Sequence, residues 1–120
     1  MSLPTIASIL PLYRREAAAR SKEHAAVLVF LLGAPGISGD RRFRSNISDS
    51  GAIYWADVLS EGTWSRTEQA LITAAASLWK SGNFEFSLGG AVTRLDDSQT
   101  ELLIAMIRAR KFGQTPERDR

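Results

Sequence analysis

The amino-acid sequence predicts a mainly α-helical protein: a single orthogonal helical domain of about five helices with a minor two-stranded β element, about 52–55 with 84–88. Apolar residues recur at helical spacing in both halves of the chain, and capping signals open the later helical patterns. Strict alternation of apolar and polar residues is confined to 84–88. With 120 residues, 44% of them hydrophobic, the chain can bury one core. We therefore expect one domain over residues 1–112, with a C-terminal half over 52–112.

Residues 4–33 predict an N-terminal helical hairpin. Four apolar residues share one face of its first helix: Ile6, Ile9, Leu10 and Tyr13. Pro11 removes one backbone hydrogen bond, so we expect either a kink there or a second helix that Pro11 opens. The apolar run Ala25–Leu32 is compatible with a buried helix or a buried strand. Helix formers precede this run and Gly33 follows it, which favours the helix.

Residues 34–51 are rich in glycine and serine, which predicts an exposed connecting loop. The next segment, 52–55, is either a short strand or the start of a helix. Ser65 and Glu68 then have the spacing of a capping box, in which each side chain bonds the backbone amide of the other residue. A helix should therefore follow and reach about Trp79.

The alternating segment 84–88 predicts a half-buried strand. Because a lone strand is not stable, we expect it to pair with 52–55 as a two-stranded ribbon. A short helix should end near Leu95, and Asp96 begins a group of capping residues ahead of the final amphipathic helix. Beyond that helix, the polar residues 113–120 predict a flexible tail.

The composition excludes several classes of protein. The chain has no cysteine, which excludes disulfides, thiolate metal sites and a cysteine nucleophile. No basic stretch precedes the apolar N-terminal segment, and Pro4 and Pro11 interrupt it, so we expect no secretory signal. The longest apolar run, Ala25–Leu32, is shorter than the roughly 20 residues that span a membrane. We expect a soluble, cytoplasmic protein with no membrane partner.

We predict no catalytic, cofactor-binding or metal-binding residues. Gly33 follows an apolar run as in a phosphate-binding loop, but Ser38 stands where that loop needs its second glycine, and no lysine follows. His24 is the only histidine and has no second metal ligand at helical spacing, so we expect a structural role. Asp96 and Asp97 are adjacent at a helix start, which is typical of capping residues and not of an acid/base pair.

The net charge of +2 arises in the N-terminal part, because residues 1–50 hold seven Lys and Arg against four Asp and Glu. Most of this excess should be solvated surface. If the protein binds nucleic acid, the candidate backbone contacts are Arg14, Arg15, Arg41, Arg42 and Arg44. Residues 86–111 have the pattern of a helix-turn-helix, which makes a nucleic-acid-binding protein the alternative function, although their charges are nearly balanced.

The aromatic residues form the remaining candidate set. Most should pack in the core, but aromatic residues exposed together would mark a protein-binding surface. The candidates for such an interface are Tyr54, Trp55 and Trp64. Since no catalytic constellation is visible, we predict a non-enzymatic protein-interaction or regulatory module. Its partner would be another protein or a second copy of the chain, ahead of nucleic acid.

Several short motifs follow one another along residues 53–109: Ile53-Tyr54-Trp55, Ser65-x-x-Glu68, Ala75-Ala76-Ser77-Leu78, Phe86-Ser87-Leu88 and Leu95-Asp96-Asp97, with an apolar helix at the end. Their order resembles that of small uncharacterised bacterial proteins. The resemblance implies a mainly helical fold. It implies no activity, cofactor or site residue.

Overall fold

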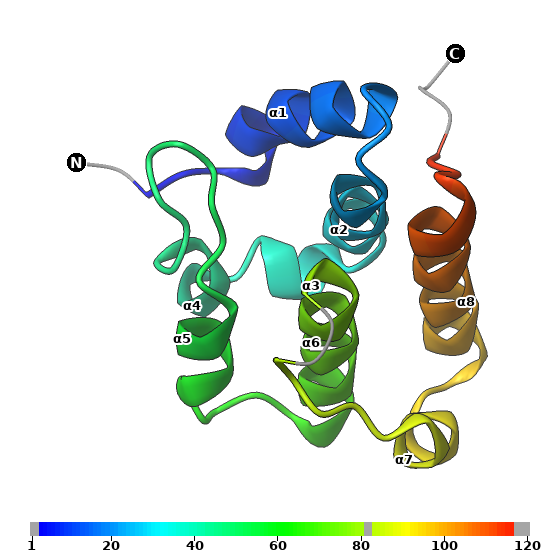
Figure 1. The fold of residues 1–120 in the computed structure, drawn as a ribbon. Coiled ribbons are helices and arrows are strands. Elements are labelled where there is room, and N and C mark those ends of the chain that lie inside the picture. The colour runs from blue at the N-terminus through cyan, green and yellow to red at the C-terminus, as the bar shows by residue number, and fades with distance from the viewer. Residues whose placement is uncertain (1–2, 81–82, 117–120) are drawn as a thin grey trace.

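Residues 3–80 and 83–116 are described by a computed structural model, in which they form eight helices joined by short connections (Figure 1). Four helices are long: α1 (Ile6–Ala18), α2 (Lys22–Gly33), α6 (Arg66–Trp79) and α8 (Asp97–Phe112). Four are short: α3 (Pro35–Ser38), α4 (Arg41–Arg44), α5 (Trp55–Ser60) and α7 (Leu88–Arg94). The radius of gyration of 13.4 Å matches the roughly 14 Å expected for a compact chain of this length.

Helix α2 lies at the centre of the fold. Each residue from Ala25 to Leu31 has at most 5% of its surface exposed, so α2 has no solvent-facing side along this stretch. A helix that is apolar on all sides needs cover on all sides. The helices α1, α6 and α8 pack directly against it and supply most of that cover (Figure 1). The prediction that the run Ala25–Leu32 is a helix and not a strand is confirmed.

Small residues bring α2 and α8 close together. Gly33 ends α2, and a Cβ atom at this position would overlap the side chain of Leu102 in α8. Ala25 and Ala26 of α2 are fully buried, as is Ala109 of α8. Because these residues add little bulk, the two backbones can approach and gain van der Waals contact.

The capping signals in the sequence act as predicted. Ser65 and Glu68 form a capping box at the start of α6, each side chain accepting a hydrogen bond from the backbone N–H of the other residue. Asp96 caps α8 in the same way together with Gln99. Helix α1 runs through Pro11 as one helix, so Pro11 does not open a separate helix.

Gly113 ends α8 in the left-handed conformation, with a φ of 77°. Its backbone N–H donates to the carbonyl oxygen of Ala109 over 2.8 Å, as in a common helix C-terminal motif. Residues 114–116 then continue without helical structure. Of the predicted flexible tail, 113–120, residues 117–120 lie outside the described part of the chain.

The predicted two-stranded β element, 52–55 with 84–88, is wrong. The described residues contain one isolated antiparallel bridge, between Ile47 and Ile53, and no strand. Ile47 takes the position beside Ile53 that the prediction gave to 84–88. Helix α5 then begins at Trp55, which leaves no room for a longer ladder. The mainly helical class holds, with eight helices in these residues in place of about five.

Phe84 and Phe86 account for the alternation that suggested a strand. Both are half-buried and pack against the core, whereas Glu85 and Ser87 are exposed. The Ser87 side chain caps α7 by accepting a hydrogen bond from the N–H of Gly90. The period-2 pattern therefore marks a segment that covers the core with one side, and a sheet is not needed to produce it.

Residues 34–51, predicted as an exposed loop, contribute α3, α4 and part of the core. Phe43 of α4 is fully buried. The centre of its ring lies 5.9 Å from that of Phe30 in α2 and 6.0 Å from that of Trp55 in α5. These tilted and edge-to-face contacts join three helices in one aromatic cluster. The glycine- and serine-rich composition of 34–51 gave no indication that Phe43 belongs to the core.

Gly51 holds the end of this segment against α1. Its φ of 92° lies in the left-handed region that favours glycine, and a Cβ atom there would lie 2.8 Å from Leu12. Its carbonyl oxygen accepts a 2.9 Å hydrogen bond from the buried hydroxyl of Tyr13. Burial raises the pKa of Tyr13 to about 12, so this hydroxyl remains a donor at neutral pH.

We expect Gly51→Ala to lower the free energy of unfolding by about 2 kcal/mol, because a side chain adds strain at a positive φ and crowds Leu12. The measurement is chemical denaturation. Gly36→Ala is the matched control, since a Cβ at Gly36 would meet no atom within 4 Å outside its chain neighbours and the backbone of its own helix. This control should be neutral or slightly stabilising. Equal effects of the two variants would show that Gly51 is not constrained.

Candidate interaction surface

Arg42, one of the predicted nucleic-acid contacts, holds two parts of the fold together. Its guanidinium forms a 2.9 Å ion pair with Asp40 and donates a 2.9 Å hydrogen bond to the carbonyl oxygen of Thr63. It also lies 4.0 Å from the ring centre of Trp64, a cation–π contact. The hydrogen bonds from Arg42 hold the pKa of the Asp40 carboxyl below its usual value. This arginine therefore connects α4 to the segment before α6.

The other four predicted contacts do not share one environment. Arg44 donates a 2.9 Å hydrogen bond to the carbonyl oxygen of Pro4, which ties the start of the chain to α4. Arg41 and Arg15 are exposed, and Arg14 is half-buried. Since Arg42 and Arg44 are engaged within the protein, the basic groups do not present five free cations to a phosphate backbone.

Only one of the three predicted interface aromatics is exposed. Trp55 is 4% exposed and belongs to the aromatic cluster. Trp64 is 8% exposed, and its indole Nε1–H donates a 2.8 Å hydrogen bond to the carbonyl oxygen of Val58. Tyr54 is 52% exposed. Trp55 and Trp64 thus serve the core, and the three residues do not form a joint binding surface.

His24 packs edge-on against Trp79, with ring centres 4.8 Å apart. Its Nδ1 lies 2.6 Å from the hydroxyl of Ser21, the residue that caps α2. Burial lowers the pKa of His24 below its ordinary value, an effect that the nearby Glu16 and Glu23 oppose. No group of three or more metal-ligating residues is found among the described residues.

The glycine-rich end of α2 lines an open hollow of about 280 Å³ beside the starts of α6 and α8. Glu68 is also part of its lining. A carboxylate repels phosphate, so the hollow offers no support for a nucleotide-binding loop, in agreement with the missing second glycine and lysine.

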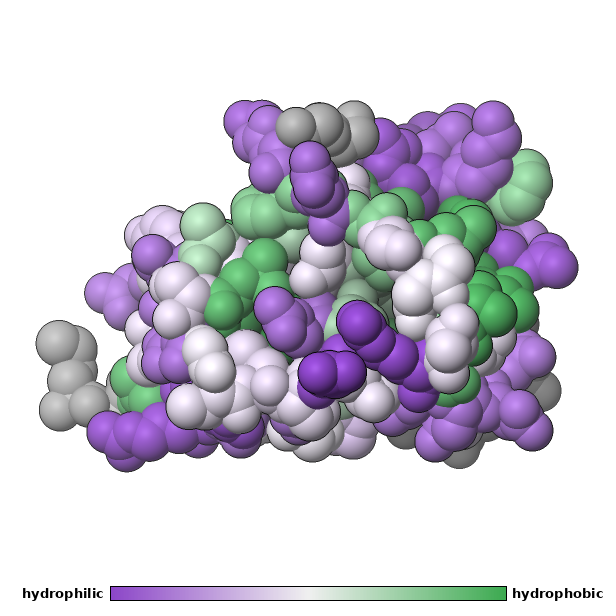
Figure 2. Space-filling view, turned by 90° about the horizontal axis from the view of Figure 1, so that it is seen from below, coloured by the Kyte–Doolittle hydropathy of each residue, from purple (hydrophilic) through white to green (hydrophobic). Residues whose placement is uncertain are grey.

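Apolar side chains are exposed on α7. Leu88 is 57% exposed and Val92 is 59% exposed, and their spacing of four residues puts them on one side of this short helix. Figure 2 shows hydrophobic residues at the right-hand edge of the molecule, the side on which α7 lies. Helix α7 has seven residues, which makes this a small patch.

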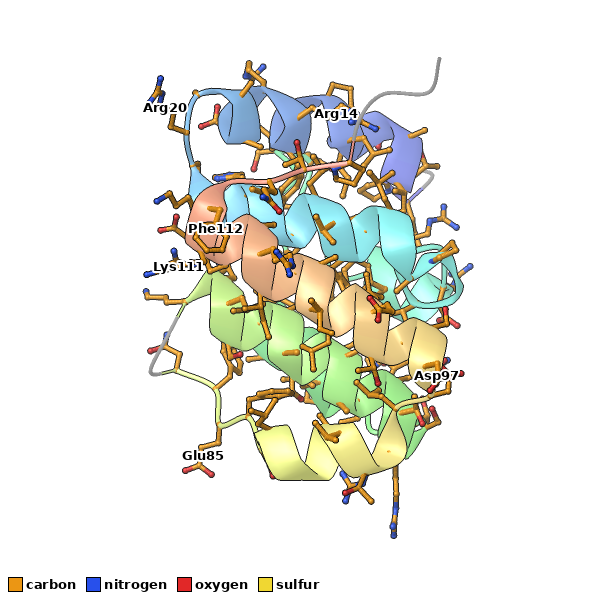
Figure 3. The ribbon with its side chains drawn as sticks, turned by 90° about the vertical axis from the view of Figure 1, so that its right-hand side faces the viewer. Arg14, Arg20, Glu85, Asp97, Lys111 and Phe112 are labelled. Atoms are coloured by element: carbon orange, nitrogen blue, oxygen red, sulfur yellow. The ribbon has the colours of Figure 1, made fainter. Side chains whose placement is uncertain are left out.

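A second pair of exposed apolar side chains lies on the longer helix α8. Its inner face buries Leu103, Met106 and Ala109, yet Ile104 and Ile107 on the outer face are 39% and 43% exposed. Spacings of three and four residues align the outer face as a stripe: Thr100, Ile104, Ile107 and Lys111. We call this set the α8 stripe. Helix α8 lies at the front of the molecule in Figure 3, where this side is open to solvent.

The amphipathic pattern of the final helix does not predict the α8 stripe, but the run 102–107 does indicate it. These residues are all apolar, and a helix that packs one side against a core cannot bury six consecutive residues. Such a run implies either a helix enclosed on all sides, as for α2, or one with a second partner.

Comparisons with known proteins add no relative. No family model matches the chain, and no curated protein or solved structure is significantly similar to it. Among the described helices, none combines the length and the apolar character needed to cross a membrane. The resemblance over residues 53–109 stays a prediction.

We expect Arg42→Ala to lower the melting temperature, because it removes the contacts to Asp40, Thr63 and Trp64 together. Arg41→Ala is the control, an adjacent exposed arginine of the same helix. Thermal unfolding followed by circular dichroism compares the two. A melting temperature unchanged in Arg42→Ala would argue against this structural role.

The depressed pKa of His24 predicts a loss of stability in mild acid. The unfolded chain binds a proton at His24 more readily than the folded protein does, so protonation favours unfolding. The contribution of His24 is fully present above its unfolded pKa of 6.5 and is lost as the pH falls through the folded pKa. Denaturation from about pH 7 to about pH 5 should show a smaller loss of stability in His24→Gln than in the wild type. Equal slopes would contradict the prediction.

Proposed function

We propose that the protein is a non-enzymatic interaction module that binds a protein partner through the α8 stripe. The observation that supports this most directly is the exposure of Ile104 and Ile107 on the outer face of a helix whose inner face is in the core. Apolar area removed from water stabilises a complex by roughly 25 cal/mol per Å². Such a stripe is the feature by which a helix docks into a groove or against another helix.

The rigidity of α8 supports the same proposal. Asp96 and Gly113 cap its two ends, and Arg110 fixes it to α6 with a 3.0 Å hydrogen bond from its Nε to the carbonyl oxygen of Leu78. A surface that is already ordered loses little entropy when it binds, which increases affinity. Charged residues such as Arg108 beside the stripe would form the polar rim of an interface.

The charge of α8 favours a protein partner over nucleic acid. In a helix-turn-helix, the first residues of the second helix face the bases. The start of α8 carries Asp96, Asp97 and Glu101, which would face the phosphates of DNA. Two exposed positions further along are isoleucines, Ile104 and Ile107. We also propose a cytoplasmic location, since a chain without cysteine suits a reducing compartment.

The test compares two pairs of exposed apolar residues. Immobilised wild-type protein, Ile104→Gln/Ile107→Gln and Leu88→Gln/Val92→Gln are incubated with lysate from the source cells, and retained proteins are quantified by mass spectrometry. We expect the α8 pair to reduce retention of a specific partner about ten-fold, since central apolar residues carry most binding energy. The α7 pair should retain it.

Light scattering of the same three proteins tests whether the partner is a second copy of the chain. A mass that rises with concentration in the wild type, and less in the α8 pair, would identify self-association as the mode of binding. Retention of the same proteins by all three samples, with no difference in mass, would refute the proposed function.

A further inference from the structure

Three adjoining hollows surround the segment that follows α8. The first, about 270 Å³, is lined by Arg20, Lys22 and Phe112, and the second, about 330 Å³, by Arg14 and Leu28. These two share Ala17 and Gly113 in their linings. The third, about 230 Å³, shares Thr115 and Pro116 with the second and adds Val29, Ala105 and Arg108. Together we call them the basic groove.

The charged side chains that line this groove are of one sign. Among residues 3–80 and 83–116, four cationic side chains line it, Arg14, Arg20, Lys22 and Arg108, and no acidic side chain does. The whole chain has 15 basic and 13 acidic residues, so an unsorted surface would place acids among the four. Figure 3 shows Arg14 on α1, Arg20 in the turn beyond the end of α1, and Lys111 with Phe112 at the end of α8. The potential in the groove is therefore positive.

The four cations are available to a ligand. Over residues 3–80 and 83–116, no hydrogen bond or ion pair is formed by the charged groups of Arg14, Arg20, Lys22 or Arg108. This distinguishes them from Arg42, Arg44 and Arg110, which hold the fold together. Arg20 also has a φ of 75°, the one non-glycine residue with a positive φ in the described residues. A cation is thus present at a turn where glycine would avoid strain.

The apolar part of the groove selects among anionic ligands. Phe112 is 63% exposed at one end, and Ala17, Ala18 and Leu28 complete the linings. Single-stranded nucleic acid uses several aromatic residues to stack successive bases, but Phe112 is the only aromatic residue here. A peptide that carries acidic and apolar residues matches both the charge and the apolar lining of the groove.

We propose that the basic groove binds an acidic, partly apolar segment of a protein partner. This inference rests on the proposed function, and it names the chemistry of the partner next to the α8 stripe. Arg108 and Phe112 line the groove and belong to α8, the helix that also carries the stripe. The segment would place carboxylates beside Arg14, Arg20 and Lys22 and an apolar side chain against Phe112.

The experiment measures binding of a fluorescent peptide of alternating glutamate and leucine by anisotropy at low salt. The double variant Arg14→Gln/Lys22→Gln should weaken binding about ten-fold, and added salt should weaken binding to the wild type, as expected for charge-assisted recognition. Arg66→Gln/Arg94→Gln is the matched control. It removes two exposed arginines from a different hollow, between α6 and α7, that also contains Glu85. The control should change affinity less than about two-fold.

Arg20→Gly separates binding from folding. Glycine relieves the positive φ, so this variant should melt at a higher temperature than the wild type while binding the peptide more weakly. Absence of peptide binding, equal loss in the groove and control variants, or tighter binding of single-stranded oligothymidylate or phosphatidylserine vesicles would each overturn the proposal.

The outcomes also separate this inference from the proposed function. Peptide binding that depends on the groove cations, together with unchanged partner retention in Ile104→Gln/Ile107→Gln, would refute the role of the α8 stripe and keep the groove. Loss of the partner in that variant, with no peptide binding by the wild type, would refute the groove alone.

Discussion

Complete burial of α2 is the constraint on which the rest of the fold depends. Seven consecutive residues, Ala25–Leu31, are shielded from water, and a helix of this kind is stable only if neighbours cover every side. Helices α1, α6 and α8 cover it, and Phe43 brings α4 against Phe30. Gly33 lets α8 come close. The short helices α3, α4 and α5 therefore help to cover α2.

The same enclosure determines which polar groups remain for binding. Arg42, Arg44 and Arg110 use their guanidinium groups to join segments that are distant in sequence. The charged groups of the cations that line the basic groove form no hydrogen bond or ion pair with the described residues. Among the described residues, some cations thus bond distant segments of the fold, and others line the groove without such a bond. The stripe and the groove adjoin because both involve α8, the helix with one face in the core and one outside.

Local rules of the sequence predicted the local structure well. The apolar run that became α2, the capping box at Ser65 and a cap among the residues from Asp96 depend on neighbours within four residues, and each was found. Failures came where the contact partner had to be chosen among several segments. Ile53 pairs with Ile47, six residues away, and not with 84–88. The environment of Arg42 does not follow from spacing, because it depends on which segments pack against it. The apolar run 102–107 indicates a second apolar face on α8, but it does not show which of its residues stay exposed.

The edge-on contact between His24 and Trp79 gives the protein a built-in optical reporter. Indole emission responds to the charge of an adjacent imidazole, which quenches it when protonated. Trp55 and Trp64 lie in the core and beside Arg42, away from the only histidine of the chain. The junction of α1, α2 and α6 can thus be followed by fluorescence without any attached dye.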